Sequence, residues 1–268
     1  MSAPRHSLSE RQRLRKRADY FFGTGLRARG EVAAFANELR QLGPTVAIGG
    51  FLRDLYLDGN RYFVSDVDFV VDPGSMQAFE RLATRLGARP NRFGGYGVSL
   101  GRWKADVWPL ERTWAAVHGH VEIRTIEDVL DATFFDWDSV IYAVGTGRLT
   151  AGEGYFQRLR DRVIDINLEP NPNPLGNAVR ALRYAYRWKA ALGAKLACHV
   201  EKQLRDHGWE AFVLSERRSF ARPVLYALDR RLIEQALARC VRADVREVAL
   251  NLHPRQQELC WREQDQIV

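Results

Sequence analysis

The sequence of 268 residues lacks the marks of secreted, membrane-spanning and disulfide-bonded proteins. No run approaches the ~20 apolar residues that a membrane-spanning helix needs, and the N-terminus lacks the apolar core of a signal peptide. The few cysteines are odd in number, lie far apart and match no zinc-binding spacing: Cys198, Cys240 and Cys260. We therefore expect a cytoplasmic protein with no membrane partner and no disulfide framework.

Several catalytic arrangements are also missing. The sequence contains no Walker-type phosphate loop and no Ser/His/Asp grouping. His118 and His120 have no third ligand close by, so we expect an ordinary loop there rather than a zinc site. Four tryptophans are interpreted as core residues in preference to platforms for stacking bases: Trp103, Trp108, Trp114 and Trp137.

Negative charge is scarce near the N-terminus. The chain has a formal net charge of +7, and residues 1–29 hold eight Arg or Lys against two acidic residues, so six of the seven net charges lie there. We treat residues 1–29 as a basic N-terminal arm, because such a segment favours polyanions such as RNA. The alternative is a solvated helix or a partly disordered leader.

Helical and strand-like patterns alternate from residue 30 to residue 166, which predicts an α/β (α+β) domain built around one mixed sheet. Residues 167–173 form an Asn- and Pro-rich linker that cannot be a regular helix. Residues 174–268 have helical periodicity and predict an all-helical C-terminal domain. In the first domain we expect helices over 31–42, 51–57 and 76–86, and strands over 45–48, 62–72, 92–100, 104–110 and 133–144.

One expected strand carries two carboxylates. Asp66 and Asp68 are separated by one residue, and alternate residues of a strand point to the same side. Like charges held side by side repel each other, and a shared divalent cation relieves the repulsion. A solvated strand end is the alternative for an isolated Asp-x-Asp sequence. The apolar flanks favour the cation-binding interpretation, because unpaired buried charges are costly.

A glycine pair precedes this strand. Gly49 and Gly50 stand between a short β-prone run and an amphipathic run, and a turn that opens a helix can hold phosphates through its backbone N–H groups. The alternative is a tight strand-to-helix turn that holds no ligand. Together with the two carboxylates, the turn predicts a place to hold a complex of a metal with a nucleotide.

The segment 46–54 and the following Asp66-Val67-Asp68 resemble the head-domain signature of the tRNA nucleotidyltransferase and bacterial poly(A) polymerase family. In that family a glycine pair, an Arg-Asp and an Asp-x-Asp open the catalytic domain, which belongs to the polymerase-β-like nucleotidyltransferase superfamily. Weaker similarity extends to about residue 190, through Phe93-Gly94-Gly95, Asp106-Val107, the run 133–142 and the segment 174–185.

The resemblance implies a nucleotidyltransferase head followed by a helical neck-like domain. It implies Mg²⁺-dependent transfer of a nucleoside monophosphate from an NTP, ATP or CTP, to a hydroxyl acceptor, with release of pyrophosphate. Asp66, Asp68 and Asp106 would be the catalytic residues and would hold two Mg²⁺ ions. The expected acceptor is the 3′ end of a tRNA-like RNA. The expected nucleotide-binding residues are Gly49, Gly50, Arg53, Asp138, Arg180 and Arg183.

Several of these residues have a second interpretation. Arg53 is equally suited to contact a phosphate or to pair with a neighbouring aspartate, Asp54 or Asp68. Asp138 stands where the family has an asparagine near the nucleotide, with a surface role as the alternative. Arg180 and Arg183 are spaced to contact the triphosphate or RNA from one helix, or to lie on a solvated face.

Two family motifs are absent. The positions of an Arg-Arg-Asp and of a base-selecting Glu-Asp-x-x-Arg hold other residues here: Ala132, Thr133, Phe134, Pro172, Asn173 and Gly176. Their loss motivates two further hypotheses. One is nucleotidyl transfer to a protein, a small molecule or a signalling nucleotide. The other is a catalytically silent module that binds RNA or a nucleotide.

Overall fold

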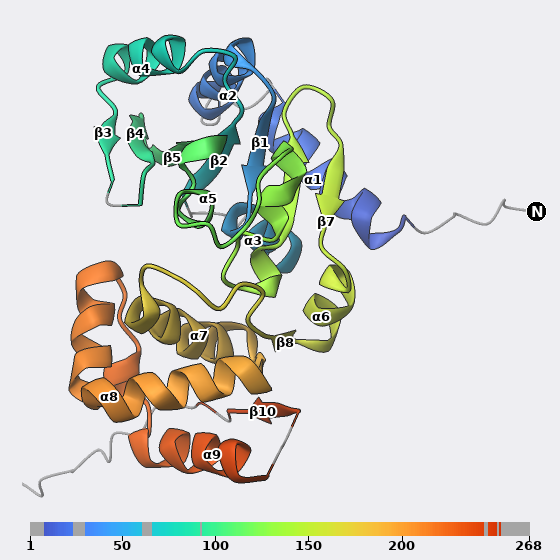
Figure 1. The fold of residues 1–268 in the computed structure, drawn as a ribbon. Coiled ribbons are helices and arrows are strands. Elements are labelled where there is room, and N and C mark those ends of the chain that lie inside the picture. Colours follow the sequence, from blue (N-terminus) through green and yellow to red (C-terminus); the bar gives the residue numbers. More distant parts are fainter. Residues whose placement is uncertain are drawn as a thin grey trace, which may run out of the picture. The chain divides into compact units, whose positions relative to one another are not determined.

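The computed structural model describes residues 8–23, 30–60, 66–91, 93–243, 246–250 and 252. The chain divides into two compact units, residues 1–173 and residues 174–268 (Figure 1). The division falls at the end of the Asn- and Pro-rich segment, whose prolines cannot continue a helix. Within the described part of the chain, no helix combines the length and the apolar character needed to cross a bilayer.

A seven-stranded mixed sheet forms the centre of the first unit (Figure 1) and confirms the expected α/β class. The strands lie in the order β3-β4-β5-β2-β1-β6-β7. Neighbouring strands are antiparallel, except for the parallel pair β2 and β5. Their bounds are β1 (Thr45–Ile48), β2 (Val67–Val71), β3 (Arg89–Pro90), β4 (Tyr96–Leu100), β5 (Trp103–Pro109), β6 (Val140–Ala143) and β7 (Leu149–Ala151).

Four helices pack on one side of this sheet, which we call the helix face. The ring of Phe69 on β2 lies 6.1 Å from that of Phe22 and 5.7 Å from that of Phe35, and the ring of Phe79 lies 5.3 Å from that of Tyr96. These aromatic contacts join the sheet to three of the helices. The four helices are α1 (Glu10–Phe22), α2 (Gly30–Leu42), α3 (Gly50–Leu57) and α4 (Met76–Arg85).

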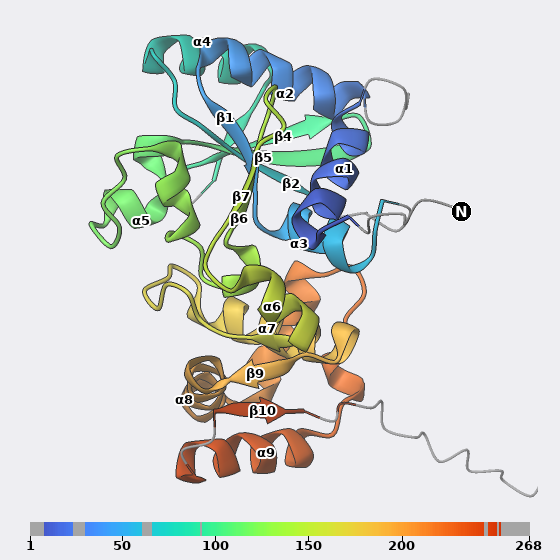
Figure 2. The same cartoon turned by 90° about the vertical axis from the view of Figure 1, so that its right-hand side faces the viewer.

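The opposite side of the sheet is covered by the chain that follows β5. This segment contains the 3₁₀ turns η1 (Leu110–Arg112) and η2 (Ile126–Leu130), with the short helix α5 (Trp114–Val117) between them. Figure 2 shows α5 and α1 on opposite sides of the sheet. The apolar side chains that join segment and sheet are Val46, Val70, Leu110, Val129, Leu130 and Ile141. Because alternate residues of a strand face opposite sides, Asp68 lies on this side with Val70.

Helix α1 belongs to the packed body of the first unit, so residues 8–23 do not match the alternative of a solvated helix or a disordered leader, while RNA binding by this segment stays a prediction. Its apolar residues follow helical spacing and are fully buried: Leu14, Ala18 and Phe21. Arg17 Nη1 donates hydrogen bonds of 2.7 Å to the carbonyl oxygens of Leu55 and Tyr56. Residues 1–7 and 24–29 of the expected arm lie outside the described residues.

Two expected strands are shorter than predicted, because side chains bond the backbone and compete with the sheet. Asn91 Oδ1 accepts hydrogen bonds from the N–H groups of Phe93 and Gly95, so β4 begins only at Tyr96. The run 133–144 contains the 3₁₀ turn η3 (Asp136–Asp138) before β6. Residues 62–65 of the carboxylate strand lie outside the described residues, and β2 begins at Val67.

The first unit ends with α6 (Tyr155–Asp161) and β8 (Val163–Ile164). The second unit contains α7 (Pro174–Trp188), α8 (Ala194–Ser219), the turn η4 (Leu225–Ala227) and α9 (Arg230–Ala243). The expected helical domain also has a short antiparallel pair, β9 (Ala191–Gly193) with β10 (Glu247–Ala249). Gly208 breaks α8 with φ 75° and ψ 164°, a conformation that favours glycine.

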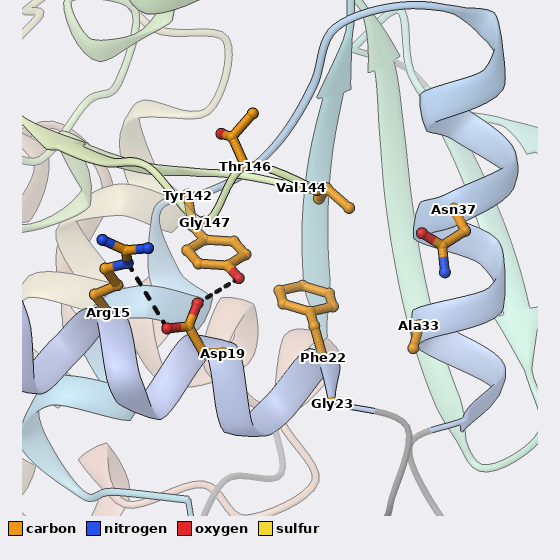
Figure 3. A pocket seen from close by; sticks show the side chains of 11 residues that line it. Arg15, Asp19, Phe22, Gly23, Ala33, Asn37, Tyr142, Val144, Thr146 and Gly147 are labelled. Atoms are coloured by element: carbon orange, nitrogen blue, oxygen red, sulfur yellow. Dashed lines mark hydrogen bonds and ion pairs between the residues drawn. The ribbon is translucent and has the colours of Figure 1, made fainter.

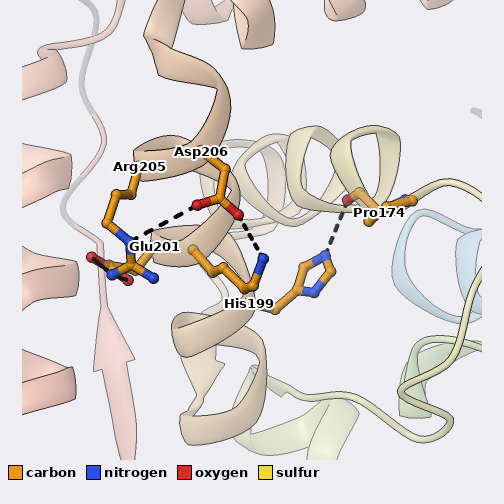
Figure 4. Close-up of polar contacts among 6 residues, drawn as sticks. Pro174, His199, Glu201, Arg205 and Asp206 are labelled. Atoms are coloured by element: carbon orange, nitrogen blue, oxygen red, sulfur yellow. Dashed lines mark hydrogen bonds and ion pairs between the residues drawn. The ribbon is translucent and has the colours of Figure 1, made fainter.

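Polar contacts on α8 are shown in Figure 4. Arg205 Nη1 donates 2.9 Å hydrogen bonds to both Glu201 carboxylate oxygens, and its Nε lies 4.0 Å from Asp206. His199 Nε2 lies 3.0 Å from the Pro174 carbonyl oxygen, at the start of α7. An exposed ion pair one helical turn apart, such as Arg205 with Glu201, contributes only about 0.3–0.5 kcal/mol to stability. The buried apolar residues therefore hold α7 against α8: Val179, Leu182, Ala185, Leu196 and Val200.

Candidate functional site

Three strands place the predicted carboxylates at one point of the sheet. Asp68 lies opposite Asp106 on the parallel strand β5 and opposite Ile48 on the antiparallel strand β1. Directly opposite residues of neighbouring strands project to the same side, so Asp68 and Asp106 share the side away from α1–α4, which we call the carboxylate face. Asp66 precedes β2 by one residue. Gly49 follows Ile48 directly, so the glycine turn leaves the sheet beside Asp68.

These carboxylates influence one another electrostatically. Loss of surrounding water raises the pKa of Asp66 above its usual value, and the negative charge of Asp106 adds to this increase, while Lys104 opposes it. Partial burial likewise raises the pKa of Asp106, opposed by a hydrogen bond from Asn91 and by Lys104. Burial thus disfavours the charged form of both carboxyl groups, and a cation bound beside them would favour it.

Asn91 supports Asp106 and was not singled out by the sequence interpretation. Its Nδ2 donates a 3.3 Å hydrogen bond to Asp106 Oδ1, while its Oδ1 closes the turn before β4. Gly97 lies opposite Asp106 on β4, and a Cβ added there would approach Asp106 Oδ1 to 3.3 Å. The sequence feature that pointed to Asn91 is the turn that it forms with Gly94 and Gly95, shortly before the strand that carries Asp106.

The glycine turn has a backbone shape that favours glycine at its first position. Gly49 has φ 70° and ψ −127°. Its N–H donates to the Val140 carbonyl oxygen at 3.0 Å, and its own carbonyl oxygen accepts from the N–H groups of Leu52 and Arg53. The turn is therefore fixed between β6 and α3. Gly50 is the first residue of α3, and the start of a helix attracts anions.

Arg53 lies between two aspartates. Its Nε and Nη2 contact Asp54 Oδ1 at 2.9 and 2.8 Å, and its Nη1 donates to Asp138 Oδ1 at 2.6 Å. The side chains are 7%, 6% and 17% exposed for Arg53, Asp54 and Asp138. Arg53 therefore pairs with neighbouring aspartates, as its second interpretation expected, although the second partner is Asp138 and not Asp68. Asp138 is largely buried and does not have the surface role that was its alternative. Direct contact of Arg53 or Asp138 with a nucleotide stays a prediction.

Asp136 precedes this network and is buried, with 9% of its surface exposed. Its Oδ1 accepts a 3.0 Å hydrogen bond from the Asp165 N–H, and its Oδ2 lies 3.1 Å from Arg158 Nη1. Burial raises the pKa of Asp136 to about 7, although the hydrogen bond and Arg158 oppose the increase. In the folded protein Asp136 thus takes up a proton well above the pH at which an unfolded aspartate does.

This difference predicts that Asp136 makes stability depend on pH. The raised pKa favours the fold below about pH 4, and the advantage is lost as the pH rises to about 7, because only the unfolded chain ionises readily in between. Three pKa units correspond to about 4 kcal/mol at most. Asp136→Asn should remove most of this dependence, so that the variant gains stability relative to the natural protein between pH 5 and pH 8. Urea unfolding at both pH values measures it, and parallel pH profiles would contradict it.

Arg180 and Arg183 lie on α7 in the second unit, and the structure treats them differently. Arg180 is exposed. Arg183 Nη1 contacts the fully buried Glu216 and donates a 3.0 Å hydrogen bond to the Arg222 carbonyl oxygen. Its guanidinium carbon lies 4.0 Å from the centre of the Phe220 ring. Arg183 therefore links α7 to the end of α8, and its predicted nucleotide contact would have to compete with a buried carboxylate.

A separate pocket of about 420 Å³ lies on the helix face, away from the carboxylates (Figure 3). The Tyr142 hydroxyl donates a 2.8 Å hydrogen bond to Asp19, and the Tyr142 ring stacks on Phe22 with centroids 5.4 Å apart. Arg15 lies 3.7 Å from the same Asp19 carboxylate. None of the predicted site residues lines this pocket, so the pocket and the carboxylates are distinct features of the sheet.

Whether the carboxylate face can bind Mg²⁺ depends on how many protein carboxylates the ion requires. Among the residues that the structure describes, no three His, Cys, Asp or Glu side chains form a ready-made metal centre. Mg²⁺ seldom requires one, because it keeps several waters and binds through one or two carboxylates together with substrate phosphates. Asp68 and Asp106, with Asp66 in electrostatic range, suit that mode of binding.

Comparison with known proteins shows similarity in fold but none in sequence families. No protein-family model matches the chain, and no curated protein sequence does. Among solved structures, the apo form of a tRNA-processing enzyme matches with a TM-score of 0.51 and 22% identity, over 79% of this chain and 56% of that one. A CCA-adding enzyme in complex with CTP matches with a TM-score of 0.51 and 19% identity, over 76% of this chain and 52% of that one. The chain shares its fold with these enzymes over the matched part.

The Thermotoga maritima CCA-adding enzyme in complex with tRNA matches as well, with a TM-score of 0.50, 17% identity, and coverage of 76% of this chain and 52% of that one. These matches confirm at the level of the fold the resemblance first drawn from the Gly-Gly and Asp-x-Asp motifs. This chain spans little more than half the length of the solved structures it matches.

Proposed function

We propose that the chain is a nucleotidyltransferase that uses the carboxylate face to transfer a nucleoside monophosphate from an NTP to a hydroxyl acceptor. The observation that carries the proposal is the pairing of Asp68 with Asp106 across β2 and β5, beside the glycine turn that follows β1. It unites a cation-binding pair with a helix start suited to phosphate. The matched structures bind CTP and tRNA, which supports an NTP and an RNA as partners.

In this proposal each group has a distinct task. Asp68 and Asp106 hold the cation, and Asp66 adds negative charge at the edge of the same site. Bound Mg²⁺ would neutralise phosphate charge and help to activate the acceptor hydroxyl. The start of α3 at Gly50 receives the triphosphate, where a side chain at Gly49 would be strained by its positive φ. Asn91 keeps the Asp106 carboxylate in position.

The acceptor is proposed to be an RNA 3′ end. Acceptors of another kind remain the competing hypothesis, and one observation favours it. Two arginines expected to grip the nucleotide or RNA are already held by carboxylates, Arg53 by Asp54 and Asp138, and Arg183 by Glu216. A guanidinium that already pairs with a carboxylate attracts a polyanion less strongly.

Incubation with each labelled NTP, Mg²⁺ and total RNA tests the proposal. We expect label in RNA with the natural protein and none above background with the Asp66→Ala/Asp68→Ala variant. Mass spectrometry of reactions without RNA separates the alternatives, since new nucleotide or protein adducts would assign another acceptor. RNA binding that is insensitive to Mg²⁺, with no turnover of any NTP, would instead indicate a silent binding module.

A further inference from the structure

Three aromatic rings cluster on the segment that follows β5. The Trp114 ring lies 4.7 Å from the His118 ring at an angle of 27°, and 4.8 Å from the His120 ring at 34°. The two imidazoles are nearly parallel to each other, at 8° and 6.2 Å. His118 Nδ1 lies 2.9 Å from the Trp114 carbonyl oxygen, which fixes the His118 ring over the helical turn. We call these three residues the ring cluster.

The ring cluster is accessible, which corrects the interpretation of Trp114 as a core residue. His118 and His120 are exposed, Trp114 is half-buried, and the adjacent Val117 is 62% exposed. By contrast, Trp137 is fully buried. The Trp114–His118 and His118–His120 pairs are stacked and the Trp114–His120 pair is tilted, so the cluster presents aromatic surface to solvent, which gains free energy when it is covered.

The ring cluster lies on the same side of the sheet as the predicted catalytic carboxylates. Its helix α5 sits between η1 and η2, whose residues Leu110 and Val129 pack onto Val70. Val70 is two residues beyond Asp68 on β2, so both point to the carboxylate face. Figure 2 likewise places α5 on the side of the sheet opposite to α1. The ring cluster and the predicted catalytic carboxylates are therefore on one face of the sheet.

Charge around the ring cluster is balanced. Arg112 pairs with Glu80 at 3.1 Å, and Arg124 pairs with Glu122 at 2.7 Å. Phosphate attraction is thus a poor explanation for any binding at this place. Flat rings without a surplus of positive charge suit a base, since every nucleobase offers a π-face for stacking on an aromatic side chain.

We propose that Trp114, His118 and His120 form a platform on which an unpaired nucleobase of the acceptor RNA stacks. This inference rests on the proposed function and adds to it the place where the acceptor strand is held. The platform recognises the flat face of a base and is therefore tolerant of sequence. It increases the affinity for RNA but neutralises no phosphate, so it should not change the salt dependence of binding.

Fluorescence anisotropy with a short, end-labelled single-stranded RNA tests the platform. Loss of a base–aromatic stack corresponds to an increase in Kd of about 5- to 150-fold, so Trp114→Ala should weaken binding within that range. Trp114→Phe, which keeps a flat ring, should restore most of the affinity. The matched control is Tyr226→Ala, which removes an aromatic residue that is 58% exposed in η4, and it should leave Kd unchanged.

Two comparisons separate stacking from a general effect. Natural protein and Trp114→Ala should bind an abasic RNA of the same length equally. Their plots of log Kd against log salt concentration should be parallel, because no phosphate contact is removed. If Trp114→Ala does not fold, the exposed double variant His118→Ala/His120→Ala replaces it. Unchanged Kd in a folded variant, or an equal loss with abasic RNA, would overturn the platform.

Nucleotide transfer measured in parallel keeps the two proposals distinguishable. Transfer to RNA by the natural protein, with no effect of Trp114→Ala on Kd, contradicts the platform alone. Base-dependent RNA binding that Trp114→Ala weakens, with no transfer by the natural protein, supports the platform and contradicts the proposed reaction.

Discussion

Asp68→Asn is expected to lower the rate of nucleotide transfer by about three orders of magnitude. Asp68 is the residue on which the site converges, because it lies opposite Asp106 on one side and opposite the end of β1 on the other. Asparagine has nearly the same shape, so the strand should form, but it carries no negative charge to hold a cation. Incorporation of label from an NTP under saturating Mg²⁺ measures the effect.

Asp72→Asn is the matched control for this prediction. Asp72 follows the other end of β2, and its backbone N–H donates a 2.8 Å hydrogen bond to the Pro44 carbonyl oxygen, which the substitution preserves. We expect unchanged transfer in this variant and unchanged melting temperatures in both. Transfer by Asp68→Asn at more than a tenth of the natural rate would contradict the assigned role.

Glu216→Ala is expected to destabilise the second unit by about 3 kcal/mol or more. The Glu216 carboxylate is completely buried and accepts hydrogen bonds from the N–H groups of Val224, at 3.0 Å, and Leu225, at 2.8 Å. It also contacts Arg183. Alanine would leave two N–H groups without an acceptor, would remove the carboxylate partner of the Arg183 guanidinium, and would leave a cavity at the end of α8.

Chemical denaturation with circular dichroism, compared with Glu216→Gln, measures this effect. Glutamine keeps an oxygen that can accept from the N–H groups but loses the charge that pairs with Arg183, so its loss of stability should be clearly smaller. Arg183→Ala should also destabilise the unit, whether or not a nucleotide is present. A stable Arg183→Ala variant with weakened NTP binding would instead favour the nucleotide contact that the sequence predicted.

The α/β class and the position of the Asp-x-Asp strand could be predicted from the sequence. Alternation in β2 and the glycine turn are local features, and local features are what periodicity reports. The pairing of Asp68 with Asp106 was implied only by resemblance. It depends on a parallel register between strands 38 residues apart, which no local pattern encodes.

The partners of the arginines were harder to predict. Arg53 and Arg183 each have a carboxylate partner far away in sequence, Asp138 and Glu216 respectively. A sequence can show that a guanidinium is present, but tertiary packing decides whether a carboxylate or a ligand reaches it. The burial of helix α1 was also hard to predict, because its many arginines lower its average hydrophobicity although Leu14, Ala18 and Phe21 form a buried apolar stripe.

The position of the transferred label tests the central claim most directly. In parallel reactions with natural protein, Mg²⁺ and an RNA acceptor, the NTP carries its label on either the α- or the γ-phosphate. Nucleotidyl transfer predicts that the α-label enters the acceptor while the γ-label leaves as pyrophosphate. If the γ-label entered the acceptor, or if neither label moved, the carboxylate face would not be a nucleotidyltransferase site.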